Sequence, residues 1–239
     1  IEGCRALAYF TGLHEDVAHD HEDPAVRLQA DDLVQLLTPV VKSFLTDEGF
    51  NCANEGLQVL GGSGFTEDWG IEQLVRDSRI TRIYEGTNGI QALDLVGRKL
   101  GLGGGRAVRN YFALIEAWLK ANAEAEHVAA VGAALKQLQQ ATLWIASEGM
   151  KDPEQAGAAA TPYLRLFALT SLAWMWARMA AVAKAKLAAG STETLFYGAK
   201  LKSADFFMAR ILTETDSLLA EVKAGKATLM AFSDEEFAA

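Results

Sequence analysis

Cysteine is scarce in this 239-residue chain: the only two, Cys4 and Cys52, lie far apart and form no Cys-x-x-Cys pair. A disulfide framework or a zinc knuckle needs more cysteines at closer spacing, so the composition supports neither. Sparse cysteine is typical of a reducing compartment, and we expect a cytoplasmic protein. The chain starts at Ile1 without a basic segment followed by an apolar core, so we expect no signal peptide.

Basic residues are outnumbered: 22 Lys and Arg stand against 31 Asp and Glu, which gives a formal net charge of −9. A nucleic-acid-binding surface needs clustered Lys and Arg, so this balance argues against a nucleic-acid partner. A small anionic substrate is still compatible with it, because a local basic site can lie on an acidic protein. Hydrophobic residues make up 50% of the chain, which is typical of a globular protein with a substantial core.

Alternating runs of β-branched residues are nearly absent, whereas helical periodicity dominates, so we predict an all-α fold. Apolar residues at helical spacing predict long helices over residues 27–44, 128–145, 163–189 and 194–222. Pro39 should kink the first of these or make it restart. Gly190 and Gly225 are expected to mark the ends of the last two.

Glycine also marks the best domain boundary. Four of the five residues in the stretch 101–105 are glycine, and each costs roughly 1 kcal/mol inside a helix, so this stretch should break the helical run. We expect it to be a linker between a four-helix-type bundle, residues 1–100, and a second helical domain, residues 106–239.

Two further stretches have a functional and a structural interpretation. The apolar segment 166–183 is close to the ~20 residues that span a membrane, but it contains Arg178, so we favour a buried or interface helix over membrane attachment. Side chains that can coordinate a metal ion are frequent in the polar stretch before Pro24: His14, Glu15, Asp16, His19, His21, Glu22 and Asp23. Their spacing matches no recognised ligand pattern, and we favour a solvated loop over a metal site.

Glu85 is the strongest candidate for chemistry. Thr87 is a suitable N-cap for a helix over residues 88–96, because its hydroxyl can accept from the amides of the next turn. The dipole of that helix favours the charged form of the carboxylate, while burial beside an apolar ligand would raise its pKa. A carboxylate under both influences can act as a general base. The alternative is an exposed acidic residue near a helix start, which periodicity alone favours.

A glycine-rich stretch, Gly61-Gly62-Ser63-Gly64-Phe65, lies upstream of Glu85. It lacks the Lys-Ser/Thr pair of a phosphate loop and follows a helix-like run, whereas a dinucleotide fingerprint follows a strand. By itself it predicts a helix C-terminus and a tight turn, at which the phosphates of a ligand could approach the backbone closely.

Three blocks, in their order and spacing, resemble the carboxy-terminal signature of acyl-CoA dehydrogenases. They are Gln58-Val59-Leu60-Gly61-Gly62-Ser63-Gly64-Phe65, Arg76-Asp77-Ser78-Arg79-Ile80 and Tyr84-Glu85-Gly86-Thr87-Asn88. Residues 1–50 are similar to the preceding helices of that family's final bundle. Residues 106–239 resemble the extra helical domain of its larger bacterial branch, which includes methylmercaptopropionyl-CoA dehydrogenases. Phe65 and Ser78 depart from the Tyr and Ala that are common in the family.

The resemblance implies an activity. In this family the Glu of the Tyr-Glu-Gly-Thr motif removes a proton from the carbon α to the thioester. A hydride leaves the β carbon for N5 of FAD, which gives a trans-2-enoyl-CoA. Glu85 stands at the position of this catalytic base, and its backbone N–H, with a ribityl hydroxyl of the flavin, would stabilise the enolate oxygen. Tyr84, Glu85 and Gly86 would then contact the acyl-CoA substrate.

The same resemblance implies two groups of FAD-binding residues. Gln58, Gly61 and Gly62 would meet the adenylate end, often from a neighbouring subunit, so we expect a homodimer with completed sites. Near Glu85 the implied FAD contacts are Thr87, Asn88 and Gln91. Capping and turn formation are an alternative role for all of these residues, compatible with the first. Structural ion pairs that position the loop are expected from Arg76, Asp77 and Arg79.

The resemblance covers only part of the family's architecture. Its amino-terminal helical domain and middle β domain have no counterpart here, so we expect a fragment that neither binds FAD tightly nor turns over alone. The parent protein is expected to pass electrons to an electron-transfer flavoprotein. An acyl-CoA oxidase, which shares the base and the hydride step, is an alternative. A non-catalytic helical oligomerisation module is a second alternative for the isolated fragment.

Overall fold

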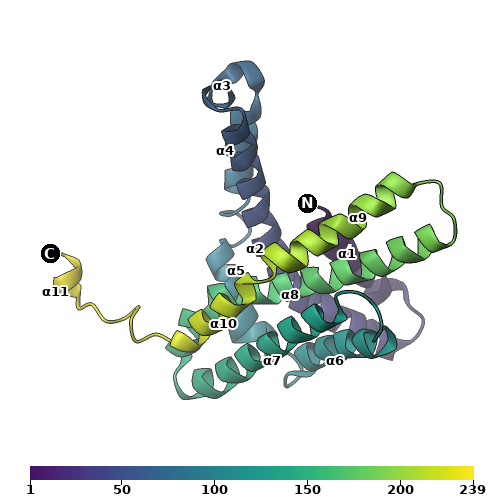
Figure 1. Ribbon diagram of the computed structural model, residues 1–239. Coiled ribbons are helices and arrows are strands. Elements are labelled where there is room, and N and C mark those ends of the chain that lie inside the picture. Colours follow the sequence, from purple (N-terminus) through teal and green to yellow (C-terminus); the bar gives the residue numbers. More distant parts are fainter.

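The computed structural model describes residues 1–239 and contains helices without any strand, which confirms the predicted all-α fold (Figure 1). The helices are α1 (Glu2–Asp20), α2 (Pro24–Val59), α3 (Gly62–Phe65), η1 (Glu67–Trp69), α4 (Ile71–Ile80), α5 (Asn88–Asp94), η2 (Leu95–Lys99), α6 (Arg106–Ala121), α7 (Val128–Lys151), α8 (Pro153–Ala188), α9 (Thr194–Phe206), η3 (Phe207–Ile211), α10 (Glu214–Ala224) and α11 (Asp234–Phe237).

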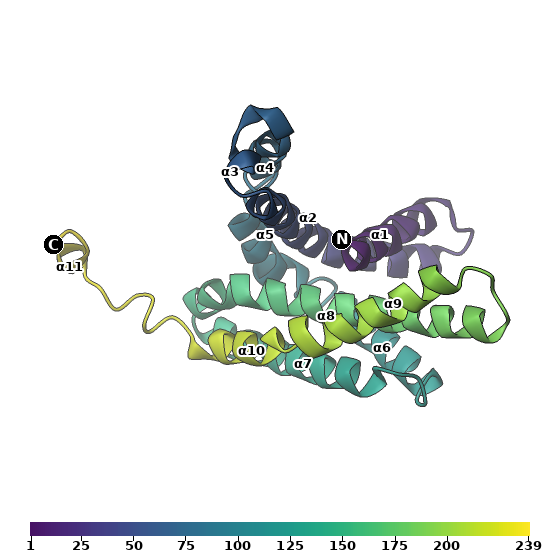
Figure 2. The same cartoon turned by 45° about the horizontal axis from the view of Figure 1, so that its top comes forward.

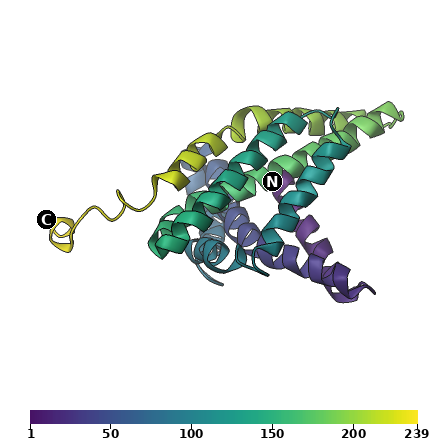
Figure 3. The same ribbon diagram turned by 90° about the horizontal axis from the view of Figure 1, so that it is seen from below.

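The chain forms a helical body from which an arm projects (Figures 1 and 2). The arm, residues 51–80, consists of the end of α2 together with α3, η1 and α4, and Gly64 is its only buried residue. At 36 residues, α2 is about 54 Å long, so one continuous helix belongs to both the body and the arm. The last residues after α10 extend away from the body and end in α11 (Figures 1 and 3).

The two longest helices, α2 and α8, begin with the same local device. In each, an Asp precedes a Pro, and the Asp carboxylate accepts a hydrogen bond from the second amide that follows, at 2.8 Å for Asp23 and 3.0 Å for Asp152. Asp caps the first turn, and Pro suits the first helical position because its missing N–H is not needed there. The predicted start of α8 at residue 163 is therefore wrong: the helix begins at Pro153 and continues through Pro162.

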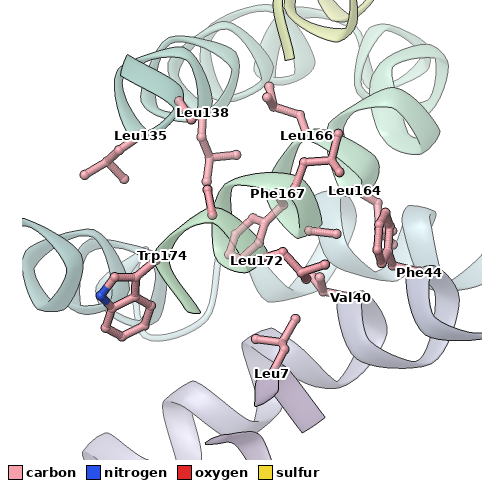
Figure 4. Packing of buried hydrophobic residues seen from close by; sticks show 14 of the residues in the cluster. Leu7, Val40, Phe44, Leu135, Leu138, Leu164, Leu166, Phe167, Leu172 and Trp174 are labelled. Atoms are coloured by element: carbon pink, nitrogen blue, oxygen red, sulfur yellow. The ribbon is translucent and has the colours of Figure 1, made fainter. Parts of the chain in front are cut away.

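Helix α8 is the centre of the hydrophobic core. Every residue from Leu166 to Ala177 is buried, so the helix is covered on all sides. Figure 4 shows its side chains between Leu135 and Leu138 of α7 on one side and Leu7 and Val40 of α1 and α2 on the other. One cluster of 38 buried residues therefore includes both predicted domains, and the division into two domains stays a prediction.

By length and composition α8 is also apolar enough to cross a membrane. Its most apolar 18-residue window has a mean hydropathy of 1.4, and 78% of that window is buried inside the protein. Core helices of globular proteins pass the same test, so this property by itself is weak support for a membrane span.

Two predicted helices contain breaks that the sequence did not reveal. The stretch 194–222 is interrupted by the π-helical turn η3, where the Leu212 N–H donates to the Phe207 carbonyl at 2.9 Å. A second π-helical turn, η2, follows α5. The predicted ends are confirmed, since Gly190 and Gly225 follow α8 and α10 with φ of +79° and +67°. Helix α2 runs without a restart through Pro39.

The stretch 101–105 forms a tight turn. Gly103, Gly104 and Gly105 have φ of +58°, +66° and +81°, a run of left-handed residues that only glycine adopts readily. The next residue, Arg106, donates from Nε and Nη2 to the two carboxylate oxygens of the buried Asp32 of α2, at 2.7 and 3.0 Å. This ion pair fixes the start of α6 against α2.

Candidate active site

The predicted base lies in a loop with an unusual backbone. Glu85 belongs to the segment that joins α4 to α5, and its φ is +56°. Gly86 follows with φ of +80°. Only one other residue besides glycine has a positive φ, His127. The left-handed conformation costs an ordinary residue roughly 1–2 kcal/mol, and such strain concentrates at functional sites.

Hydrogen bonds within the segment fix this conformation. The Thr87 hydroxyl accepts from the Ile90 N–H at 3.3 Å, which confirms the predicted N-cap of α5. The Gln91 side-chain amide donates to the Glu85 carbonyl at 2.9 Å, and the Asn88 N–H donates to the Arg82 carbonyl at 3.1 Å. The first turn of α5 therefore folds back onto the loop and holds it.

Helix α2 holds the same loop from the side of the body. The ammonium group of Lys42 donates to the Gly86 carbonyl at 2.7 Å and to the Asn88 side-chain oxygen at 2.8 Å. The Asn88 amide nitrogen donates to the Ser43 carbonyl at 3.1 Å and to the Thr46 hydroxyl at 3.0 Å. Since both ends of the Asn88 amide are engaged within the chain, this residue connects the loop to α2, and its predicted contact with FAD stays a prediction.

A second connection lies one turn along α2. The Arg82 guanidinium forms an ion pair with Asp47 at 2.5 Å and lies over the Phe50 ring, 5.2 Å from its centroid. Salt bridges within the chain do not include any of the three residues predicted to form them, Arg76, Asp77 and Arg79. That prediction is wrong: these side chains lie on the exposed arm helix α4, whereas Arg82 lies where the loop meets α2.

The outer side of the loop is open. Glu85 and Gly86 are exposed, and the neighbouring apolar side chains of Tyr84 and Ile90 are 48% and 54% exposed. The amide N–H groups of Glu85, Gly86 and Thr87 donate to no backbone carbonyl of the chain. A carboxylate, unused N–H donors and apolar surface therefore lie together, an arrangement that suits a ligand with both a polar carbonyl and an apolar chain.

The glycine-rich turn is at the far end of the arm. Helix α2 ends at Val59 and Gly61 has φ of +60° and ψ of −145°, so the predicted helix end and tight turn are confirmed. A side chain at Gly61 or Gly62 would meet no atom within 4 Å, which leaves room for a ligand. The ten residues of α4, about 15 Å, separate this turn from the Glu85 loop. Within one chain the two predicted groups of FAD-binding residues thus form separate surfaces.

Two family models match the chain. "Acyl-CoA dehydrogenase, C-terminal domain" matches residues 6–100, and "Acetyl-CoA dehydrogenase C-terminal like" matches residues 111–233, which is more than half of the chain. The chain belongs to the acyl-CoA dehydrogenase family. The resemblance seen in the three sequence blocks is thereby confirmed.

Individual acyl-CoA dehydrogenases show how much of such a protein this chain represents. It is 38% identical over 219 residues to the 3-methylmercaptopropionyl-CoA dehydrogenase of Ruegeria pomeroyi, covering 89% of this chain and 37% of that relative. It shares its fold with Caenorhabditis elegans ACDH-11 in complex with C11-CoA, with a TM-score of 0.69 and 21% identity over 86% of this chain and 33% of the other. An acyl-CoA dehydrogenase complexed with FAD from Bacillus anthracis gives a TM-score of 0.70 and 18% identity, and the match covers 99% of this chain and 41% of the other. The chain therefore spans well under half the length of these proteins.

The acyl-CoA dehydrogenase motif did not reveal Lys42. This lysine lies between Val41 and Phe44 in the apolar stripe of α2, and the only signal in the sequence is a cation inside an otherwise apolar run. Its partners, Gly86 and Asn88, follow 44 and 46 residues later, beyond the reach of any local pattern.

The metal-capable stretch near the N-terminus is mostly helical. His14 and His19 lie in α1, where each Nδ1 is within 3.0 Å of the carbonyl of the residue four positions earlier, so the predicted loop is wrong for this part. Donor atoms of Glu126, His127 and Asp205 come within 4.8 Å of one another elsewhere in the fold. The Lys184 ammonium group forms a salt bridge with the Glu126 carboxylate at 2.8 Å and lowers the pKa of Glu126. A metal ion would have to compete with this cation for the carboxylate.

Proposed function

We propose that this chain is the carboxy-terminal helical part of an FAD-dependent acyl-CoA dehydrogenase, which converts an acyl-CoA thioester into a trans-2-enoyl-CoA. The observation that carries the proposal is the Glu85 loop: its left-handed backbone presents an exposed carboxylate next to unused backbone N–H donors. Membership of the family supports this assignment.

The two groups on Glu85 have complementary tasks. Its carboxylate takes the proton from the carbon α to the thioester, and negative charge then develops on the thioester oxygen. An N–H donor aimed at that oxygen stabilises the charge, which makes the weakly acidic α proton removable. FAD, when bound, accepts the hydride that leaves the β carbon. Gln91 and Lys42 hold the carbonyls of Glu85 and Gly86, which fixes the N–H groups of the same two peptides, those of Gly86 and Thr87. The N–H groups of Glu85, Gly86 and Thr87 have no backbone acceptor and are available to the substrate.

The residues present fit FAD at two surfaces. Beside Glu85, the N–H and the hydroxyl of Thr87 donate to no group of the chain and can donate to a ligand. At the end of the arm Gly61 and Gly62 leave room for close approach to the backbone. Since α4 separates these surfaces, we propose that each belongs to a different FAD in a homodimer, where the arm of one subunit completes the site of the other. We also propose a cytoplasmic location and an electron-transfer flavoprotein as the acceptor.

The test uses the full-length protein that carries this sequence, loaded with FAD and titrated anaerobically with a panel of acyl-CoAs that includes a thioether-containing acyl group. We expect acyl-CoA to bleach the flavin absorbance of the wild type and of Glu221→Gln, a control on the exposed face of α10. Glu85→Gln should bind FAD without bleaching. Equal bleaching by Glu85→Gln and the wild type would show that another group takes the proton. Peroxide formation in air would identify an oxidase.

A further inference from the structure

Lys42 is the one charged side chain of α2 that reaches into the Glu85 loop with two hydrogen bonds. Its ammonium group lies 2.7 Å from the Gly86 carbonyl oxygen and 2.8 Å from the Asn88 side-chain oxygen. Hydrogen bonds from a charged donor are about twice as strong as neutral ones, so this pair is a strong restraint on a short segment.

The restraint acts at the point where the backbone is strained. Glu85 and Gly86 both have positive φ, and their two carbonyls have different partners in the chain: Gln91 donates to the first and Lys42 to the second. Together these contacts fix the two peptide planes that flank Gly86. The first of these planes contains the Cα atom of Glu85, so the contacts fix the point from which the Glu85 side chain extends.

Lys42 also lies in the electrostatic field of the site. Burial lowers the pKa of its ammonium group, while the carboxylates of Asp47 and Glu85 act in the opposite direction. Asp47 is already paired with Arg82 at 2.5 Å, whereas Glu85 has no salt-bridge partner within the chain. The Lys42 ammonium group therefore forms no salt bridge with the proposed base and holds the backbone next to it instead.

We propose that Lys42 is a positioning residue for the acyl-CoA dehydrogenase reaction: by holding the Gly86 carbonyl against α2, it fixes the segment that carries Glu85 and aims the Glu85 carboxylate at the substrate. This inference rests on the proposed function of Glu85. Helix α2 holds the loop at two points. It carries Lys42, and its Ser43 and Thr46 accept hydrogen bonds from the side chain of Asn88, the second partner of Lys42.

The experiment measures flavin bleaching in the full-length FAD-loaded protein after rapid anaerobic mixing with acyl-CoA. Lys42→Met keeps most of the apolar stem but removes the ammonium group. We expect the rate constant of bleaching at saturating substrate to fall about 100-fold, the effect of misplacing a reacting group by roughly 1 Å. FAD content and substrate affinity should stay as in the wild type. Lys136→Met, on the exposed face of α7, is the matched control and should match the wild-type rate.

A second readout separates positioning from a purely structural role. With acyl-CoA deuterated at the α carbon, slower proton removal in Lys42→Met should increase the isotope effect on bleaching. Loss of folded protein would only lower the amplitude and leave the isotope effect unchanged. If Lys42→Met does not hold FAD, Lys42→Gln serves the same purpose, because its amide is one atom shorter and uncharged.

The two proposals fail in different ways. Wild-type bleaching by Glu85→Gln would overturn the proposed function. If Glu85→Gln does not bleach, but Lys42→Met bleaches with the wild-type rate constant and isotope effect, only the role of Lys42 is overturned.

Discussion

The hydrogen bond between Tyr111 of α6 and Ser171 of α8 predicts an unequal pair of substitutions. Both side chains are fully buried, and the Tyr111 hydroxyl donates to the Ser171 oxygen at 2.7 Å. Ser171 in turn donates to the Phe167 carbonyl at 2.8 Å. Removing either hydroxyl breaks the same bond but leaves a different partner behind.

Tyr111→Phe leaves no donor unsatisfied, because Ser171 still donates to Phe167, and the new ring can keep its stacking on Phe167. It should cost about 1 kcal/mol, the net value of one hydrogen bond. Ser171→Ala leaves the Tyr111 O–H buried without an acceptor, which should cost about 2 kcal/mol. Adding Tyr111→Phe to Ser171→Ala should therefore recover part of the loss.

Thermal unfolding followed by circular dichroism tests this order. For 239 residues the entropy of unfolding is roughly 0.5 kcal/mol/K, so each kcal/mol lowers Tm by about 2 °C. We expect Tm to fall by about 2 °C in Tyr111→Phe and about 4 °C in Ser171→Ala. A larger loss in Tyr111→Phe, or a double variant less stable than Ser171→Ala, would refute the reasoning.

Two further predictions concern the N-cap of α5 and an ion pair. Thr87→Ala should lower stability by about 1 kcal/mol in urea unfolding, while Thr87→Ser should not, because only the hydroxyl caps α5; equal losses would mean that the methyl group matters instead. Lys226 lowers the pKa of Asp152, so the stability from this pair is present above the ordinary pKa of Asp and is lost as pH falls through the lowered value. Lys226→Met should therefore lower Tm at pH 7 and have little effect near pH 2, and a pH-independent difference would contradict the pairing.

Local rules in the sequence predicted the parts of the fold that depend on local physics. Gly190, Gly225 and the Thr87 cap are correct because a helix end needs a left-handed residue and a helix start needs a side-chain acceptor, both of which a short motif specifies. The predicted start of α8 at residue 163 was wrong because it followed the very apolar run, whereas the helix begins ten residues earlier, where Asp152 caps it and Pro153 is its first residue.

Contacts between distant segments could not be read from local patterns. The Lys42 contacts join residues 44 and 46 positions apart, and the Asp32–Arg106 pair joins residues 74 positions apart. Such pairs depend on how helices cross, which periodicity does not specify. The motif around Glu85 located the candidate base, but the groups that hold its loop came only from the structure.

Glycine is the residue that the backbone favours at position 85, because it adopts the left-handed conformation without the penalty that Glu85 bears. Glycine has no carboxylate, however, and could not take a proton. Selection for stability alone would therefore replace this glutamate with glycine, and under the proposed function selection for catalysis opposes that replacement. Under this proposal, stability and catalysis favour different residues at position 85, and the hydrogen bonds from Gln91 and Lys42 stabilise the conformation that Glu85 adopts.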